Sequence, residues 1–373
     1  MANTYARIKV VGVGGAGGNA INRMVNSGVE GIEFVAVNTD AQALMTSEAS
    51  HVIRIGDKLT KGLGAGGRPE VGERAAEEST EDLAESMRDC DMVFITAGMG
   101  GGTGTGASPV VAHLARQSGA LTVAVVTKPF EFEGGRRRRA AEEGVAALKD
   151  SVDALIVIPN QRLLEMVDPK TTVSEAFEIA DDVLRQGIAG ISDLITKPGM
   201  INLDFADVKT IMQDAGSALM AIGVGEGADR AVNAAREAIE SPLLEMNIRG
   251  AKGVLYNITA GNNLTLFETS EAAEVIRAAA DPDAEIIYGT SVDESLGDSM
   301  LITLIATGFD DRPDVYNDYG FGETRQQPQG GYSQPQRQAP PAGQQSYQGQ
   351  SQQEYPGEDW ESESSIIRFL RER

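Results

Sequence analysis

Cysteine and histidine are almost absent from this chain. Cys90 is the only cysteine among 373 residues, so no internal disulfide can form, which favours a reducing, cytoplasmic environment. The two histidines, His51 and His113, lie far apart in the sequence. Because zinc sites are built from several Cys or His ligands, we do not expect a zinc site.

Long hydrophobic runs and an excess of positive charge are missing as well. No apolar run reaches the roughly 18 residues that a membrane-spanning helix needs, and residues 1–7 lack the apolar region of a signal peptide. The formal net charge of -23 would repel a nucleic-acid backbone. The basic run Arg136–Arg139 suits either a solvated helix face or an anion contact. We expect neither direct membrane insertion nor nucleic-acid binding.

The first half of the chain has the pattern of a parallel sheet. A hydrophobic fraction of 41% is ample for a core. Short apolar runs rich in Val and Ile alternate with segments long enough for crossover helices. Residues 1–172 are therefore predicted to form a doubly wound, Rossmann-like α/β domain. Its predicted strands are Ile8–Val13, Phe34–Asn38, Met92–Ala97, Leu121–Val126 and Ala154–Ile158.

A long helix and a smaller domain are predicted next. The helical pattern of Val173–Thr196 ends at the stop signal Lys197-Pro198-Gly199, and we assign residues 173–197 to this central helix. Residues 198–310 are predicted to form a smaller α/β or α+β domain. Its predicted elements are helices near Asp229–Glu240 and Ser270–Ala280, and strands at Ala218–Val224, Gly253–Thr259, Asn263–Phe267, Glu285–Gly289 and Met300–Ala306.

The C-terminal part of the chain has a different composition. Gln, Gly, Pro and Ser dominate residues 311–358, which are therefore predicted to be a disordered linker. As a flexible coil, about 45 such residues would span roughly 35–40 Å. Apolar and basic residues return in 359–373, among them Trp360, Ile366 and Arg368. This end is predicted to be a short peptide that folds on a protein partner.

The first glycine-rich loop follows the first predicted strand. Gly12, Gly14 and Gly17 form a GxGxxG pattern ahead of a helix expected from about Ala20 to Asn26. The amino terminus of such a helix directs its amides at an anion. Taken alone, this motif suits a dinucleotide enzyme equally well, with Asp40 near the position of a ribose-binding acid.

A second loop separates the possible classes. The strand at Met92–Ala97 leads into Gly98–Gly106, and a helix is expected to begin near Ser108-Pro109. Bare amides and two threonine hydroxyls can surround a di- or triphosphate, and a dinucleotide fold does not need such a loop. The chain contains no GxxxxGK[ST] run, so it is not a P-loop nucleotide triphosphatase. The stretch Gly62–Pro69 is either a further phosphate contact or an ordinary loop.

The run Gly100–Gly106 resembles the signature loop of the tubulin and FtsZ superfamily. The similarity to the bacterial cell-division GTPases of that superfamily runs from Ile8 to Phe309 and includes Val37–Asp40, Pro129–Gly134 and Asn202–Asp207. It implies a protein that binds GTP or GDP with Mg²⁺, hydrolyses GTP and polymerises head-to-tail into the filaments of the division ring. It also implies a cytoplasmic location, at the division site beneath the inner membrane.

The resemblance implies which residues contact the nucleotide. The phosphates and the loops around them would involve Gly15, Ala16, Gly17, Gly18, Asn19, Asn38, Asp40, Gly102, Thr103, Gly104 and Thr105. The ribose and phosphate side would involve Glu133 and Arg137, which makes Arg137 the functional member of the arginine run.

The same resemblance places the guanine base at the central helix. Phe177 and Asp181 are four residues apart and share a helix face, so that Phe177 can stack on a purine. The Asp181 carboxylate can accept from N1–H and from the 2-amino group of guanine, and Asn160 would complete base recognition. Adenine offers neither donor, and hydrogen-bond selection of this kind can reach about 10⁴-fold.

Asn202, Asp204 and Asp207 are the catalytic residues that the resemblance implies. Hydrolysis needs a water positioned at the γ-phosphate, and the phosphate loops offer no acid or base for this. The helix Val173–Thr196 is about 35 Å long at 1.5 Å per residue, with the nucleotide at its start and these residues past its end. In the family they reach the nucleotide of the next subunit, a heterologous contact that builds a filament.

Three positions depart from the family pattern. Gly67-Arg68 stands where the family often has Ala-Asn, and Arg68 either adds a positive charge near the phosphates or points outward. Asp182 stands where many members carry Asn. Residues 364–373 keep the apolar-then-basic character of the family's terminal peptide but lack its usual proline. Division proteins or membrane anchors are the partners implied for this segment.

Two alternative functions stay open at this stage. A NAD-dependent oxidoreductase would use Gly12–Gly17, but it needs a catalytic His or Tyr near the cofactor, and none can be placed. A nucleotide-binding structural homologue without hydrolysis is disfavoured by the presence of Asn202, Asp204 and Asp207.

Overall fold

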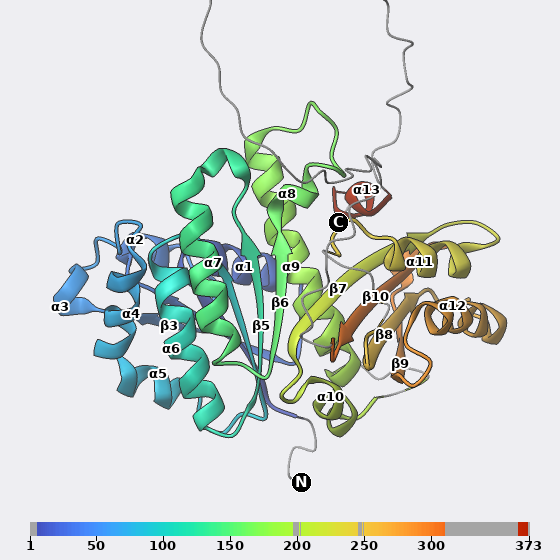
Figure 1. Cartoon of the computed structure of the whole chain (residues 1–373), viewed down its shortest axis with the longest axis horizontal. Coiled ribbons are helices and arrows are strands. Elements are labelled where there is room, and N and C mark those ends of the chain that lie inside the picture. Colours follow the sequence, from blue (N-terminus) through green and yellow to red (C-terminus); the bar gives the residue numbers. More distant parts are fainter. Residues whose placement is uncertain are drawn as a thin grey trace, which may run out of the picture. The chain divides into compact units, whose positions relative to one another are not determined.

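The structure is a computed structural model, and it describes residues 6–196, 201, 203–244, 248, 250–309 and 365–371. Within these residues, ten strands form one sheet in the order β3-β2-β1-β4-β5-β6-β7-β10-β8-β9 (Figure 1). No helix in this described part of the chain is both long enough and apolar enough to cross a membrane.

The first six strands of the sheet are parallel. β1 (Ile8–Val13) lies between β2 (Ile32–Asn38) and β4 (Met92–Gly98) and pairs with both over its full length. The others are β3 (His51–Arg54), β5 (Leu121–Lys128) and β6 (Ala154–Pro159). The five predicted strands and the doubly wound fold are confirmed. β3 was missing from the prediction because it has only four residues, most of them exposed.

Helices cover both faces of this parallel part. Alternate residues of β1 belong to two core clusters, Ile8 and Val10 to one and Val11 and Val13 to the other. The first cluster includes residues of α1 (Gly14–Asn26) and α9 (Val173–Thr196). The second includes residues of α4 (Pro69–Glu78), α5 (Thr80–Ser86), α6 (Thr103–Gln117) and α7 (Gly135–Lys149). Short helices are α2 (Ala41–Met45), α3 (Asp57–Thr60), η1 (Glu131–Glu133) and α8 (Asn160–Leu163).

Two helices begin earlier than the sequence predicts. α1 starts at Gly14, not near Ala20, and α6 starts at Thr103, not near Ser108, so that Pro109 lies inside it. Glycine has a low intrinsic helix propensity, so tertiary packing overrides local preference in these first turns. The glycine run is therefore a loop only up to Gly102, and Thr103–Gly106 form the first turn of α6.

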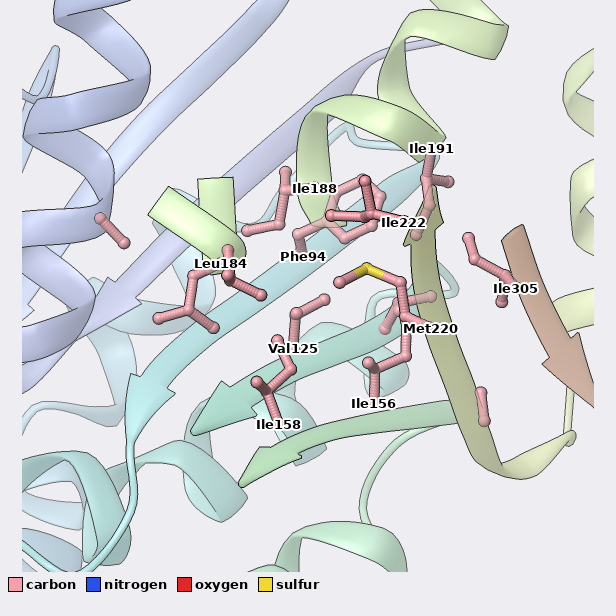
Figure 2. Packing of buried hydrophobic residues seen from close by; sticks show 14 of the residues in the cluster. Phe94, Val125, Ile156, Ile158, Leu184, Ile188, Ile191, Met220, Ile222 and Ile305 are labelled. Atoms are coloured by element: carbon pink, nitrogen blue, oxygen red, sulfur yellow. The ribbon is translucent and has the colours of Figure 1, made fainter. Parts of the chain in front are cut away.

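α9 has the predicted bounds, and its apolar side chains form the centre of the molecule. Leu184, Ile188 and Ile191 pack with Val125 and Ile156 of the parallel strands and, on the other side, with Met220, Ile222 and Ile305 of β7 and β10 (Figure 2). Because all of these side chains are almost completely buried, the position of α9 is fixed from both sides.

The sheet continues into a mixed part. β7 (Gly216–Gly225) pairs with β6 only over Gly216–Ala218 and is then antiparallel to β10 (Met300–Thr307). The remaining elements are β8 (Gly253–Ala260), β9 (Glu285–Val292), α10 (Phe205–Met212), α11 (Arg230–Ile239), α12 (Leu266–Ala279), η2 (Glu294–Leu296) and α13 (Ser365–Arg371). The predicted strand Asn263–Phe267 is wrong. Thr265 is the N-cap of α12 and forms a capping box with Glu268.

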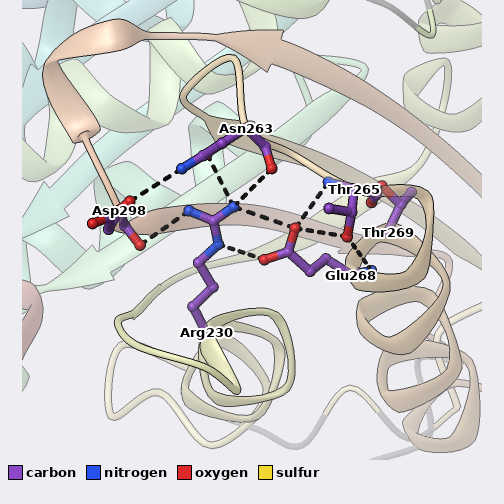
Figure 3. Close-up of polar contacts among 6 residues, drawn as sticks. All are labelled: Arg230, Asn263, Thr265, Glu268, Thr269 and Asp298. Atoms are coloured by element: carbon purple, nitrogen blue, oxygen red, sulfur yellow. Dashed lines mark hydrogen bonds and ion pairs between the residues drawn. The ribbon is translucent and has the colours of Figure 1, made fainter.

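A buried arginine connects three elements of this mixed part (Figure 3). Arg230 at the start of α11 is only 5% exposed and donates to Glu268 Oε1 at 2.6 Å, to the Asp298 backbone oxygen at 3.0 Å and to Asn263 Oδ1 at 3.0 Å. The bond from Arg230 lowers the pKa of Glu268 to about 2. The guanidinium thereby holds α11, the start of α12 and the turn before β10 together.

In the parallel part, α6 lies close against α4 at Gly106. A Cβ at this position of α6 would lie 1.9 Å from the Pro69 carbonyl oxygen and 2.7 Å from the Glu73 backbone nitrogen, both in α4. We expect Gly106→Ala to lower the free energy of unfolding by about 1–3 kcal/mol or more, because α4 has to move away. The matched control is Gly135→Ala, at an exposed helix start with no atom within 4 Å. Equal thermal midpoints for the two variants would contradict this account.

Candidate nucleotide-binding site

The amino termini of α1 and α6 meet at the carboxyl ends of β1 and β4. Gly14 has φ +76°, and a Cβ there would lie 2.9 Å from the Gly104 backbone nitrogen. Neither helix has a side-chain cap on its first-turn amides. Uncapped helix termini concentrate N–H donors and partial positive charge. Two of them side by side suit the phosphates of a nucleotide.

The residues predicted to hold the phosphates lie at these two helix starts. Gly15, Ala16, Gly17, Gly18 and Asn19 belong to the first turns of α1, and Gly102–Thr105 form the N-cap and the first turn of α6. The Thr103 hydroxyl lies 2.6 Å from that of Thr39, which connects α6 to the end of β2. The Thr105 hydroxyl is buried and accepts from Gly100 N–H at 2.8 Å. Through this buried hydrogen bond, Thr105 stabilises the conformation of the glycine-rich loop before α6.

Asn38 and Asp40 also stabilise local backbone. Asn38 Oδ1 accepts from the Asp40 N–H at 3.2 Å. Asp40 Oδ1 in turn accepts from the Gln42 N–H at 2.9 Å and caps α2. These contacts hold the end of β2 beside the phosphate loops, whichever ligand binds there.

A surface pocket of about 610 Å³ lies between α1 and α9. It brings together three predicted residues, Asn19, Phe177 and Asp181. Its volume is in the range typical of small-molecule sites. Asn22 and Arg23 also line it and were not predicted. Both could have been predicted from the sequence, because they follow Asn19 by three and four residues and therefore lie on the same face of the helix.

Asp181 carries an unusual carboxyl group at the base of this pocket. Its side chain is 14% exposed, and its Oδ2 lies 3.9 Å from Nε of Arg23. Burial raises the pKa of Asp181 to about 7; Arg23 acts against this shift, and the nearby carboxylates of Glu178 and Asp182 add to it. A carboxyl whose pKa is displaced into the neutral range inside a pocket is a candidate ligand-binding group.

Phe177 is held in place by two other aromatic rings. Its centroid lies 5.4 Å from that of Phe130 and 6.3 Å from that of Phe132, both in edge-on geometry. Phe130 and Phe132 stack on each other at 5.1 Å. Phe177 nevertheless stays 38% exposed. The edge-on contacts therefore fix the ring while part of it faces the solvent, as stacking on a base requires.

Glu133, Arg137 and Asn160 lie on neighbouring elements. Glu133 forms an ion pair with Arg137, and its Oε1 accepts from the Phe130 N–H at 2.9 Å. Asn160 is 4% exposed, and its Oδ1 has no hydrogen-bond partner among the described residues. A buried carbonyl oxygen without a partner is costly. Asn160 is therefore suited to meet a donor of a bound ligand.

The departures from the family pattern have different surroundings. Asp182 accepts from Arg185 Nε at 2.5 Å and from Gln186 Nε2 at 3.1 Å, so its carboxylate is occupied within α9. Arg68 is exposed and immediately precedes α4. It lies between φ-positive Gly67 and Pro69.

The predicted catalytic acids lie at the other end of α9. Asp204 Oδ1 accepts from the Asp207 N–H at 2.9 Å, and Asp207 Oδ2 accepts from the Asp204 N–H at 3.3 Å. This capping box begins α10 and leaves Asp204 exposed. Asn202 lies outside the described residues. Because α9 spans about 35 Å, these acids are far from Phe177 and Asp181 of the same chain.

Protein ligands for a metal are scarce. Among the residues that the structure describes, no group of three or more His, Cys, Asp or Glu side chains could hold a metal ion. Mg²⁺ in nucleotide sites takes several ligands from phosphate oxygens and water.

Two uncapped, glycine-rich helix starts beside the pocket of Asn19, Phe177 and Asp181 are the arrangement of a nucleotide-binding α/β protein. The model of the Tubulin/FtsZ family, GTPase domain, matches residues 7–168, and that of the FtsZ family, C-terminal domain, matches residues 216–310. The chain therefore belongs to the FtsZ family. This membership gives it the GTP-binding and GTPase character of the family and excludes the oxidoreductase alternative.

Solved structures agree with this assignment. An empty FtsZ dimer from M. jannaschii is 48% identical with a TM-score of 0.79, over 82% of this chain and 89% of that one. A W319Y mutant of M. jannaschii FtsZ is 49% identical with a TM-score of 0.80, over 82% and 92%. CetZ2 from Haloferax volcanii, a GTPgS-bound protofilament, is 18% identical with a TM-score of 0.68, over 80% and 92%, and shares the fold.

Asp181 predicts a pH dependence of nucleotide affinity. Its pKa of about 7 means that the carboxyl is half protonated at neutral pH in the free protein. The N–H donors of a guanine base in this pocket would bind the ionised form and lower its pKa. GDP affinity should therefore fall about tenfold from pH 8 to pH 6, as one proton must be released on binding. Fluorescence titration with a labelled GDP at several pH values measures this.

The matched variants are Asp181→Asn and Asp182→Asn. Asp181→Asn should bind GDP weakly, with little change between pH 8 and pH 6. Asp182→Asn should keep most of the pH dependence, because burial, the main cause of the raised pKa of Asp181, is unchanged, and only the smallest contribution, that of the Asp182 carboxylate, is removed. A wild-type affinity that does not change between these pH values would refute the role of Asp181.

Proposed function

We propose that this protein hydrolyses GTP inside a head-to-tail filament, with each active site completed by the next subunit. The observation that carries this proposal is the separation of the base pocket, at the start of α9, from Asp204 and Asp207, at the start of α10. About 21 Å of α9, from Asp182 as the last pocket residue of the helix to Thr196 at its end, lies between them. These acids can act on a nucleotide only if it belongs to another copy.

In this mechanism, residues of two adjacent subunits contribute to each hydrolysis site. The amides at the starts of α1 and α6 hold the phosphates, while Phe177 and Asp181 select and orient guanine. Asp204 and Asp207 of the adjoining subunit orient the attacking water. Phosphoryl transfer depends mainly on positioning and on charge stabilisation, and Mg²⁺ bound to the nucleotide supplies charge neutralisation. The capping box fixes Asp204 and Asp207 relative to each other before assembly.

Such a contact joins two different surfaces and therefore continues without closing. Heterologous contacts of this kind build open filaments. The M. jannaschii relative described as an FtsZ dimer and the CetZ2 relative described as a protofilament support self-association of this chain. We infer that its filaments form the division ring in the cytoplasm, beneath the inner membrane. Residues 364–373 as a ligand for division proteins or membrane anchors stay a prediction.

The shared site predicts that GTPase activity depends on protein concentration. The rate of phosphate release per subunit, with Mg²⁺, should be close to zero below a threshold concentration and should rise steeply above it. The reason is that an isolated subunit holds the nucleotide without the acids. A rate per subunit that stays the same on dilution would exclude the shared site. GTP binding without any phosphate release at high concentration would favour the non-hydrolysing alternative.

Substitution of Asp207 should slow GTP hydrolysis without weakening GTP binding. Asp207→Ala should bind GTP like the wild type but hydrolyse it at least about tenfold more slowly, which gives long-lived polymers. Because Asp207 also belongs to the capping box, Asp207→Asn is the control: it keeps an acceptor for the Asp204 N–H but removes the charge. Equal slowing in both variants assigns the effect to the carboxylate. Loss of GTP binding in either variant would contradict the assignment.

A further inference from the structure

The C-terminal helix of this chain lies on its own folded body. α13 packs against β7 and α9 and belongs to the same compact unit as the described residues of the body (Figure 1, red helix). Ile366 is 1% exposed and Ile367 is 0% exposed. Both belong to the buried cluster that contains Val224 of β7 and Ile188 of α9. These two isoleucines of the tail are thus part of the core.

Polar contacts flank this apolar contact. Arg368 Nη2 donates to Glu226 Oε1 at 2.8 Å, just past the end of β7. The Ser365 hydroxyl donates to Oε1 of Glu237 on α11. The other oxygen of Glu237 accepts from the Val224 N–H at 2.6 Å. Glu237 therefore connects the tail directly to the backbone of β7.

The pairing of β7 shows why its surface can receive a helix. β7 pairs with β6 only over Gly216–Ala218, whereas its pairing with β10 covers Leu219–Gly225. Among the described residues, the later part of β7 therefore has a strand partner on one side. Strand edges of this kind are commonly covered by a helix or a loop. We name the surface of β7, α9 and α11 around Glu226 and Glu237 the tail groove.

We propose that the tail groove is a cis binding site for the chain's own C-terminal helix and that its occupation hides Ile366 and Ile367 from other proteins. The docked helix buries both isoleucines, so a protein that binds them has to displace it first. This second step rests on the proposed role of the tail as a partner ligand, whereas the docking does not.

Opposite charge favours docking of the tail on the body, and tethering favours docking within the same chain. The body is strongly acidic, with a net charge of -23 for the chain, and the end carries Arg368, Arg371 and Arg373. The composition between the body and the tail predicts a flexible tether, which gives its end an effective concentration on the order of 1 mM. A separate copy of the tail at micromolar concentration competes poorly against such a tether.

A labelled peptide tests whether the groove is occupied. A fluorescent peptide of residues 362–373 is titrated with full-length protein, without nucleotide, and its anisotropy is measured. We expect it to bind the full-length Ile367→Asp variant about tenfold more tightly than the wild type, because that variant has an empty groove. Equal affinity for both proteins would overturn the proposal. GTPase activity is not involved, so this outcome is independent of the proposed function.

A charge swap tests the position of the helix. In hydrogen exchange of the full-length protein, the amides of residues 366–371 should be protected in the wild type and lose protection in Glu226→Lys and in Arg368→Glu. The double variant Glu226→Lys/Arg368→Glu should regain it, because the ion pair is restored with opposite polarity. Glu240→Lys, at the exposed end of α11, is the matched control and should leave protection unchanged.

Dilution distinguishes docking in cis from docking between copies. Protection of residues 366–371 should be the same at low and high protein concentration if the helix belongs to the same chain. Protection that rises with concentration, or tail amides that exchange at the rate of an unfolded peptide in the wild type, would refute the cis site.

Discussion

The apolar face of α9 packs against the parallel strands and, at the same time, against β7 and β10 (Figure 2). This double burial fixes the helix, and the helix fixes the distance between the base pocket at its start and the acids beyond its end. In the proposed mechanism, neither place is a complete active site. The dependence of hydrolysis on assembly, as proposed, therefore follows from the packing of one helix and not from a special catalytic group.

Much of the fold could be predicted because buried parallel strands and a long amphipathic helix have strong patterns. The five strands of the first part and the bounds of α9 were predicted correctly. The errors have local physical causes. In α1 and α6, packing between the two glycine-rich turns overrides the low helix propensity of glycine. At Asn263–Phe267 the capping box of Thr265 and Glu268 outweighs a short apolar alternation.

Three of the residues predicted for the site share one pocket, and their role in binding a nucleotide stays a prediction; the electrostatics of that pocket could not be predicted. The structure brings Asn19, Phe177 and Asp181 to one pocket, whereas the pKa of Asp181 depends on the depth of burial and on Arg23, which lies far away in the sequence. The ion pair of Glu133 and Arg137 and the edge-on rings around Phe177 are tertiary facts of the same kind. The docking of α13 depends on the tail groove, which residues of α9, β7 and α11 form only after folding.

The fixed length of α9 has an evolutionary consequence. One helical turn adds about 5.4 Å to a helix, and inserting residues into α9 would also rotate every later side chain out of its place in the core. Insertions and deletions should therefore be excluded from residues 173–196, even though substitutions on the exposed face outside the pocket are tolerated. The segment that joins the body to the tail is under no such restriction, and its length can drift without altering the spacing of the two half-sites.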